Sequence, residues 1–407
     1  MGIVKADRRL MREMNNQQVL QRIRNNGPIS RPELSEQTGL GLSTISNIIS
    51  ELLEQGLILE IGEGESSGGR RPNLIDLNPL ARFAFGVKIG PGTVWISLFD
   101  LRARQLHMEE VVFDVSDVPE VLFGQIASVI LKIKKEHRIA NHLILGVGVS
   151  SSGIIDPSSG TCIYSPILNW TNVPIKEVLS QLTKLHISVE NDVNAYSYGM
   201  LLRETDSSVT NMICITTGPG VGAGIILDRK LYRGSRGGAG EFGHISIDRN
   251  GPQCACGRKG CMEVMASDQF LLSRARQLLK TNGSPVLEKI NDENKLSAKS
   301  LYYAAQLGDM ETRSIFKELG ENMGSGIADL INLFNPDKIV IGGEGVIASE
   351  FFMESLRAVA IQSSFPHLAD HLDIVVDDGS EDIWLQGAAT LVIDGFFNNL
   401  LVGTGGK

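Results

Sequence analysis

The chain lacks the features that mark membrane, secreted and disulfide-rich proteins. No apolar run in its 407 residues is long enough to span a bilayer. The first residues, Met1–Arg9, carry charges where a secretory signal would have an apolar core. Cysteine is scarce, with five in the whole chain, which does not suit a disulfide-stabilised extracellular fold. We therefore expect a cytoplasmic protein that does not insert into membranes.

Aromatic residues are also scarce, and the chain has a negative net charge. The net charge of −9 does not by itself suggest a nucleic-acid-binding protein. Basic residues are nevertheless concentrated at the start, where seven of them precede residue 32 against two acidic residues. A small basic face can still bind phosphate, because salt confines electric fields to about 8–10 Å. Glycine is plentiful, at 44 residues, which favours an α/β architecture with many tight turns.

Residues 1–80 read as a DNA-binding module. Apolar residues at helical spacing predict helices over 15–25, 30–39 and 43–55, and Ser30 with Glu33 forms a capping box for the second. Short polar side chains at the start of the third helix suit contact with base edges and phosphates. These features predict a helix-turn-helix with its recognition helix at 43–55. A three-helix module that binds protein is the alternative.

A wing follows the third helix. Residues 57–61 and 73–77 read as paired strands, and the glycine-rich loop between them carries two arginines before a proline. Arginines on such an arm can enter a narrow minor groove. A solvated linker is the alternative. The candidate DNA contacts of the whole module are Arg31, Ser43, Thr44, Ser46, Asn47, Arg70 and Arg71.

The pattern of residues 81–407 predicts two similar halves, each with three strands followed by helices. A buried strand at 143–149 leads into an expected turn at 150–157, and a second series of strands starts at 212. Two such halves with a cleft between them indicate an actin-like, ribonuclease-H-like two-lobe fold. An amphipathic helix from 388 to 401 either packs into the core or returns toward the DNA-binding module.

A cysteine-rich loop at 241–263 is the strongest chemical signal. It places His244, Cys254, Cys256 and Cys261 on one glycine-rich segment. One imidazole and three thiolates suit a closed tetrahedral zinc site, which is structural because no coordination position remains open. The Cys-x-Cys pair requires a sharply turned backbone, which the neighbouring glycines permit. Unremarkable thiols or a disulfide are the alternatives.

Three motifs together resemble the ROK family (repressors, open reading frames, kinases). They are the cysteine-rich loop, the Glu190-Asn191-Asp192-Val193-Asn194-Ala195 segment and Ile341-Gly342-Gly343. The resemblance covers nearly the whole chain. It implies a winged helix-turn-helix at 1–80 and a two-lobe sugar-binding and oligomerisation domain at 81–407. Family members with a winged helix are repressors, and those without one are usually sugar kinases.

The resemblance also implies roles for individual residues. His244, Cys254, Cys256 and Cys261 match the zinc ligands of the family. The residues that match its sugar-binding positions are Asn191, Asp192, Glu241, His244 and Glu263. Asp192 would be the general base in a kinase. The family usually has Pro-Asn near a tryptophan, and Asn169 stands in for that asparagine with a shift of two residues.

The nucleotide side departs from the kinase pattern. Lys88 replaces the aspartate of the first phosphate loop, and Pro219 in the second loop has no N–H to donate. We therefore expect no kinase activity. The expected function is a sugar-responsive repressor that binds operator DNA and a sugar effector as a homodimer or dimer of dimers. One alternative is a sugar kinase that phosphorylates a hexose with ATP. Another is a repressor whose inducing partner is a membrane transporter protein.

Overall fold

A computed structural model describes residues 8–63, 72–281, 283–292, 296–377 and 382–398. The chain divides into two compact units. The first contains residues 1–190 and 385–407, and the second contains residues 191–384. None of the helices in the described ranges is both long and apolar enough to cross a membrane.

The N-terminal part of the first unit contains the predicted helices and wing. Its elements are α1 (Arg8–Asn26), β1 (Ile29–Ser30), α2 (Arg31–Thr38), α3 (Leu42–Glu54), β2 (Ile58–Glu63) and β3 (Asn73–Leu77). The first helix begins at residue 8, seven residues before its predicted start. The strands form a sheet in the order β1-β3-β2, and β2 and β3 pair in antiparallel register. Residues 64–71, which include Arg70 and Arg71, lie outside the described residues.

Local interactions explain these helix boundaries. The Ser30 side chain accepts from the Glu33 N–H, and the Glu33 carboxylate accepts from the Ser30 N–H at 2.8 Å, which confirms the capping box. Gly39 ends α2 with a left-handed backbone at φ 71°. The recognition helix α3 buries one apolar face, which consists of Ile45, Ile48, Ile49 and Leu52.

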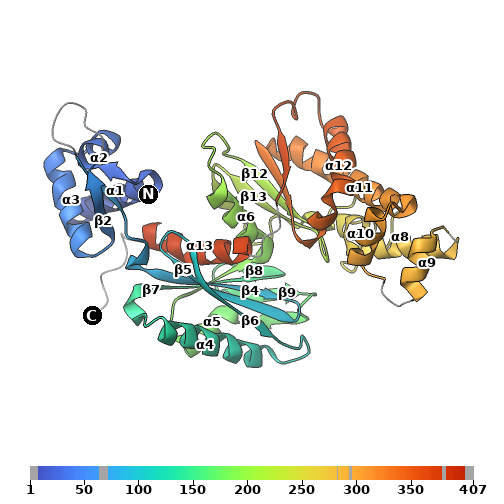
Figure 1. Cartoon of the computed structure of the whole chain (residues 1–407), viewed down its shortest axis with the longest axis horizontal. Helices are drawn as coiled ribbons and strands as arrows, with labels where there is room; N and C mark the ends of the chain where they lie inside the picture. The colour runs from blue at the N-terminus through green and yellow to red at the C-terminus, as the bar shows by residue number, and fades with distance from the viewer. Residues whose placement is uncertain (1–7, 64–71, 282, 293–295, 378–381, 399–407) are drawn as a thin grey trace. The chain divides into compact units, whose positions relative to one another are not determined.

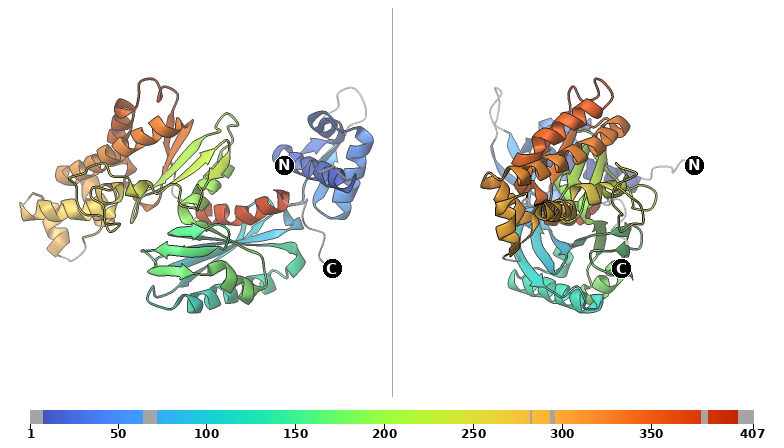
Figure 2. Two further views of the ribbon diagram at one scale, coloured as in Figure 1. Left: turned by 180° about the vertical axis from the view of Figure 1, so that it is seen from behind. Right: turned by 90° about the vertical axis from the view of Figure 1, so that its right-hand side faces the viewer.

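The rest of the first unit is built on a five-stranded sheet in the order β11-β7-β4-β5-β6. Its strands are β4 (Phe83–Gly90), β5 (Thr93–Asp100), β6 (Gln105–Val112), β7 (Ile144–Ser151) and β11 (Ile187–Asn191). The flanking elements are η1 (Pro79–Ala81), α4 (Pro119–Glu136), η2 (Asn141–Leu143), α5 (Ile175–Thr183) and α13 (Asp382–Asn398). Helices α4 and α5 cover one face, and α13 covers the other (Figures 1 and 2).

The turn expected at 150–157 is in part a strand. β7 continues to Ser151, and β8 (Ile154–Asp156) pairs with β9 (Thr161–Ser165), which pairs in turn with β10 (Trp170–Val173). The reversal takes place at Gly153, whose φ of +100° is accessible to glycine. A strand of three residues is too short to show an alternating pattern, so it could not be predicted from the sequence.

Helix α13 both packs into the core and returns to the DNA-binding module, so the two alternatives for the C-terminal segment are both correct. Its backbone packs directly on the sheet, where a Cβ at Gly148 would lie 1.7 Å from the Ala388 carbonyl oxygen. Its last turn meets α1, where Arg24 pairs with Asp394 at 2.6 Å and Gln17 donates to the Phe397 carbonyl at 2.9 Å. Apolar side chains of α1, α3 and α13 therefore belong to one continuous core.

The second unit repeats the sheet plan in the order β14-β13-β12-β15-β16. Its strands are β12 (Met212–Thr216), β13 (Gly222–Leu227), β14 (Lys230–Tyr232), β15 (Lys338–Gly342) and β16 (Asp373–Val376). Its helices are α6 (Asp192–Arg203), η3 (Phe242–His244), α7 (Met262–Ala266), α8 (Asp268–Lys280), α9 (Pro285–Asp292), α10 (Ala298–Gln306), α11 (Met310–Phe334), η4 (Glu344–Ala348) and α12 (Ser349–Ser363).

The two sheets share one topology. In each, three consecutive strands pair antiparallel (β4-β5-β6 and β12-β13-β14), and the first of them pairs parallel with a later strand (β4 with β7, β12 with β15). This duplication is that of the actin-like fold and confirms the predicted fold class.

We expect Gly148→Ala to destabilise the first unit. The added methyl group would overlap the α13 backbone at Ala388, and overpacking of this kind typically costs about 1–3 kcal/mol. Gly124→Ala is the matched control, because its Cβ would meet nothing within 4 Å and it lies inside α4, where alanine is favoured over glycine by about 0.5–1 kcal/mol. Thermal unfolding of both variants checks this. A midpoint for Gly148→Ala at or above that of the native chain would contradict it.

Candidate functional site

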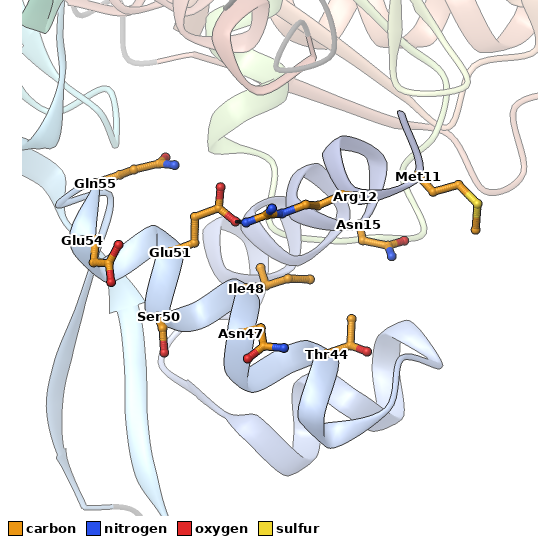
Figure 3. Close-up of a pocket in the computed structure, with 10 residues that line it drawn as sticks. All are labelled: Met11, Arg12, Asn15, Thr44, Asn47, Ile48, Ser50, Glu51, Glu54 and Gln55. Atoms are coloured by element: carbon orange, nitrogen blue, oxygen red, sulfur yellow. Dashed lines mark hydrogen bonds and ion pairs between the residues drawn. The ribbon is translucent and has the colours of Figure 1, made fainter. Parts of the chain in front are cut away.

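The recognition helix α3 presents its polar side chains to solvent. Ser43, Ser46 and Asn47 are exposed, and Thr44 is half-buried. Thr44 and Asn47 line a groove between α1 and α3 that is bounded by Arg12 and Glu51, whose side chains pair at 2.7 Å (Figure 3). All four predicted contacts on this helix therefore lie on its accessible side.

The charges near α3 are mostly paired. The hydrogen bond from Arg12 holds the pKa of the Glu51 carboxyl below its usual value. Arg31, a predicted DNA contact, lies at the start of α2 and pairs with Glu60 of β2 at 2.8 Å. Its guanidinium therefore reaches the first strand of the wing, and the pairing reduces the net positive charge it offers to phosphate.

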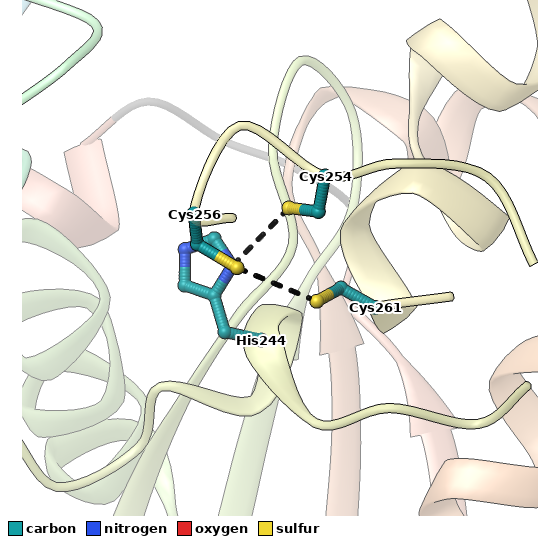
Figure 4. A group of neighbouring side chains, drawn as sticks. All are labelled: His244, Cys254, Cys256 and Cys261. Carbon is teal, nitrogen blue, oxygen red and sulfur yellow. Dashed lines mark hydrogen bonds between the residues drawn. The ribbon is translucent and has the colours of Figure 1, made fainter. Parts of the chain in front are cut away.

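The four predicted metal ligands lie together in the second unit. One ligand atom from each of His244, Cys254, Cys256 and Cys261 lies within 4.8 Å of the others (Figure 4). The His244 Nδ1 is 3.7 Å from the Cys254 sulfur, and the Cys256 and Cys261 sulfurs are 3.5 Å apart. A disulfide bond would bring two sulfurs to about 2.05 Å. Two thiolates on one tetrahedral zinc lie about 3.8 Å apart, so the spacing fits a shared cation.

Tight backbone turns bring these ligands together. The Cys254 N–H donates to the Arg258 carbonyl at 2.8 Å, and the Gly257 N–H donates to the Cys254 carbonyl at 3.0 Å. Gly260 has φ +59°, and a Cβ there would lie 1.7 Å from the Asp248 carbonyl oxygen. Only glycine fits this position, which agrees with the sharp turn that the Cys-x-Cys spacing requires.

The environments of the thiols differ. A hydrogen bond from the Arg258 backbone N–H lowers the pKa of the exposed Cys256 to about 6, which favours its thiolate. Burial raises the pKa of Cys261 to about 12. A buried thiol of this kind ionises when a cation binds beside it. The donor set and its spacing therefore fit a four-coordinate soft cation.

Asn191 and Asp192 lie where β11 passes into α6. Asn191 is the N-cap of α6, and its side-chain oxygen accepts from the Asn194 N–H at 3.1 Å. Asp192 is the first residue of the helix, at the positive end of the helix dipole. The capping role of Asn191 was not among the sequence predictions, although asparagine is one of the residues preferred at the N-cap of a helix.

Glu241, His244 and Glu263 form a second group of polar side chains. Desolvation raises the pKa of the Glu241 carboxyl; the charge of His244 opposes this, and the nearby negative charge of Glu263 adds to it. The Glu263 carboxylate lies 3.5 Å from the position of a Cβ at Gly220. These side chains thus share one electrostatic environment, as expected for a common wall of a polar pocket.

The start of β13 connects the two groups. The side chain of Val193, next to Asp192, lies 2.8 Å from the position of a Cβ at Gly222. Gly243, next to His244, packs on the Val221 carbonyl, which lies 2.1 Å from its Cβ position. The two groups of predicted sugar-binding residues in the second unit are therefore next to residues that pack on the consecutive residues Val221 and Gly222.

Asn169 belongs to the first unit. It is exposed and adopts a left-handed backbone at φ 54° in the turn before β10. Its part in sugar binding stays a prediction.

Two carboxylates that the sequence did not single out lie at the second phosphate loop. A Cβ at Gly218, the residue before Pro219, would lie 3.0 Å from the Glu344 carboxylate, and the Asp268 N–H donates to the Gly218 carbonyl at 2.8 Å. Burial raises the pKa of Asp268, and the charge of Glu344 raises it further. Glu344 directly follows Gly342-Gly343, so the motif itself could have pointed to it. In the first unit, the buried Lys88 lies with its Nζ 5.2 Å from the centre of the Trp95 ring.

The sequence profile of the ROK family matches residues 84–395, which is most of the chain. The chain belongs to the ROK family. A profile described as winged helix-turn-helix DNA-binding matches residues 15–58. The ROK core and the N-terminal module recognised in the sequence are thus both confirmed.

Named ROK relatives span nearly the whole chain. The xylose repressor of Caldicellulosiruptor bescii is 33% identical over 384 residues, covering 94% of this chain and 96% of that protein. The transcriptional dual regulator NagC of Escherichia coli is 29% identical over 374 residues, covering 89% and 90%.

Solved ROK structures match either nearly the whole chain or about three quarters of it. A ROK family transcriptional regulator described as a homologue of the Escherichia coli MLC protein matches with a TM-score of 0.83 and 27% identity, covering 97% of this chain and 98% of that one. A ROK glucokinase from Streptomyces griseus, solved with glucose and AMPPNP, matches with a TM-score of 0.63 and 28% identity, covering 76% of this chain and 98% of that one. The kinase thus leaves about a quarter of this chain unmatched.

Proposed function

We propose that this ROK protein is a sugar-responsive transcriptional repressor of carbohydrate metabolism genes. One observation carries the proposal: a winged helix with an exposed polar recognition face is joined in one chain to a ROK core that keeps its sugar-side residues. The names of the xylose repressor and NagC, which the chain matches over nearly its full length, support it. In this proposal α3 and the wing bind operator DNA, and Asn169, Asn191, Asp192, Glu241, His244 and Glu263 bind the sugar.

The proposal includes the loss of kinase activity. Pro219 removes an N–H from the second phosphate loop, and the Glu344 carboxylate beside Gly218 adds negative charge there. The phosphates of a nucleoside triphosphate would be repelled by this carboxylate, because like charges at short range disfavour binding. In the first loop Lys88 cannot ligate the magnesium ion that phosphoryl transfer requires.

We further propose that the cysteine-rich loop holds a structural zinc ion. His244, Cys254, Cys256 and Cys261 would ligate it, and the ion would supply only a cross-link, since all four positions are taken by protein. The His244 Nδ1 faces the Cys254 sulfur, so the Nε2 of the same ring is left for the sugar side. Glu241 and Glu263 would then be positioned by the same cross-linked loop.

The regulatory step requires a difference in affinity. A sugar shifts a population of conformations only if it binds one of them more tightly than the other. We propose that the chain forms a homodimer and that the sugar-bound dimer no longer matches two operator half-sites spaced by a helical turn. A ligand-induced change in operator affinity is the measurable consequence.

We expect Asn47→Ala to weaken operator binding by about 1–3 kcal/mol, because a bidentate base contact of an asparagine contributes about that much. The salt dependence should not change, because asparagine carries no charge that would release counterions. Electrophoretic mobility shifts at several salt concentrations measure both. Gln181→Ala, an exposed amide on α5, is the control and should leave affinity unchanged. Failure of the native chain to retain any genomic fragment at low salt would contradict the repressor function.

We expect one tightly held zinc ion per chain and its loss in Cys256→Ser. Cys256 is exposed, so the substitution removes a ligand with little effect on packing. Cys162→Ala, a buried cysteine far along the chain from this loop, should keep the ion. Metal content by native mass spectrometry tests this. Zinc-free protein that still responds normally to its sugar would contradict the coupling of the loop to the sugar site.

We expect a screen of free and phosphorylated sugars to find a ligand that raises the melting temperature. A ligand at 100 times its dissociation constant adds about 2.7 kcal/mol of stability. Asp192→Asn should abolish the shift, whereas Asp228→Asn, an exposed turn residue, should preserve it. A coupled ATP assay with the same sugars should show no turnover. Turnover that Asp192→Asn abolishes would instead establish a sugar kinase.

A further inference from the structure

A second group of potential metal ligands lies in the first unit, whereas the cysteine-rich loop belongs to the second. The Nε2 of His107 and carboxylate oxygens of Glu109 and Glu136 all lie within 4.8 Å of one another. His107 and Glu109 are two residues apart on the edge strand β6 and therefore lie on the same face, and Glu136 is the last residue of α4. Two secondary-structure elements therefore direct three donors at one point.

Two further side chains lie beside this group. One is a possible additional metal ligand, and the other competes with a metal ion for Glu109. The ring of His137, the residue after Glu136, lies edge-on to the His107 ring with centroids 5.2 Å apart. Two of the seven histidines in the chain are thus in contact here. The ammonium group of Lys132, one turn earlier on α4, pairs with Glu109 at 2.9 Å. This ammonium group already neutralises part of the negative charge of the site, so a metal ion would have to displace it from Glu109.

The geometry suits a divalent transition metal. The His107 Nε2 lies 3.3 Å from the Glu109 carboxylate. Two donors on one zinc ion at about 2.0–2.2 Å from the metal lie about 3–4 Å apart, so small side-chain rotations would complete the site. The C-terminal end of α4 also carries the negative end of the helix dipole, which favours a cation. Imidazole and carboxylate donors together suit zinc better than calcium or magnesium, which prefer all-oxygen sites.

We propose that His107, Glu109 and Glu136, with His137 beside them, form a second, exchangeable divalent metal site that cross-links edge strand β6 to the end of α4. The site differs in kind from the cysteine-rich loop. It has no thiolate and lies at the surface, with Glu136 and His137 exposed, so its metal would exchange with solution. Binding displaces the Lys132 ammonium from Glu109.

The test is calorimetric titration of ZnCl₂ into the full chain that retains its tightly bound zinc. One further equivalent should bind to the native protein. His107→Ala and Glu136→Gln should each weaken that equivalent on the order of tenfold or more. Lys132→Met should strengthen it, because the competing ammonium is removed, whereas a purely structural ion pair would give no such gain.

Matched controls come from the same chain. Glu110→Gln alters the exposed neighbour on β6 that points to the other face, and His367→Ala alters an exposed histidine paired with Asp370 at 2.9 Å. Both should keep the second equivalent. Amide exchange in β6 should slow on zinc addition in the native chain but not in His107→Ala. The proposal is overturned by a native chain that binds no second equivalent, by equal binding in His107→Ala and Glu136→Gln, or by loss of binding in His367→Ala, which would indicate adventitious surface binding.

Discussion

The close packing of three thiols and one imidazole constrains the loop at 241–263, which also carries Glu241 and Glu263 of the proposed sugar site. Their ligand atoms lie within 4.8 Å of one another, although burial disfavours ionisation of Cys261 and a backbone N–H favours ionisation of Cys256. A shared cation, as proposed above, would stabilise all three thiols as thiolates. Because His244 belongs to the cluster and also shares its electrostatic environment with Glu241, the backbone that positions the thiols also positions the polar wall.

In the first unit, the packing of helix α13 is the main constraint on the position of the DNA-binding module. Glycines in the sheet allow its backbone to approach the strands directly, as at Gly148. Its last turn then contacts α1 through Arg24 and Asp394, which are both about one-fifth exposed, and the Arg24 guanidinium also stacks over Phe397 at 4.3 Å. The core of the DNA-binding module is therefore continuous with that of the adjoining sheet, so the module is not a freely tethered domain.

Charge supports the proposal that this ROK core binds a sugar without phosphorylating it. The residues of the proposed sugar site keep their carboxylates, whereas the second phosphate loop combines Pro219 with the Glu344 carboxylate beside Gly218. A sugar is neutral and accepts hydrogen bonds from and donates them to such groups, but a nucleotide phosphate is repelled by them. In this proposal, differences of a few side chains on one fold separate sugar binding from phosphoryl transfer.

The sequence by itself determined the features that depend on neighbours along the chain. The Ser30–Glu33 capping box, the apolar stripe of α3, the alternating strands and the His-Cys spacing all encode local hydrogen bonds or one face of an element, so they could be predicted. The tertiary structure alone decided which distant residues meet. It placed Glu344 and Asp268 beside Gly218, Asp394 beside Arg24, and Glu136 beside His107. No periodicity records such meetings, because they depend on how separate elements pack and not on the spacing of residues within one element.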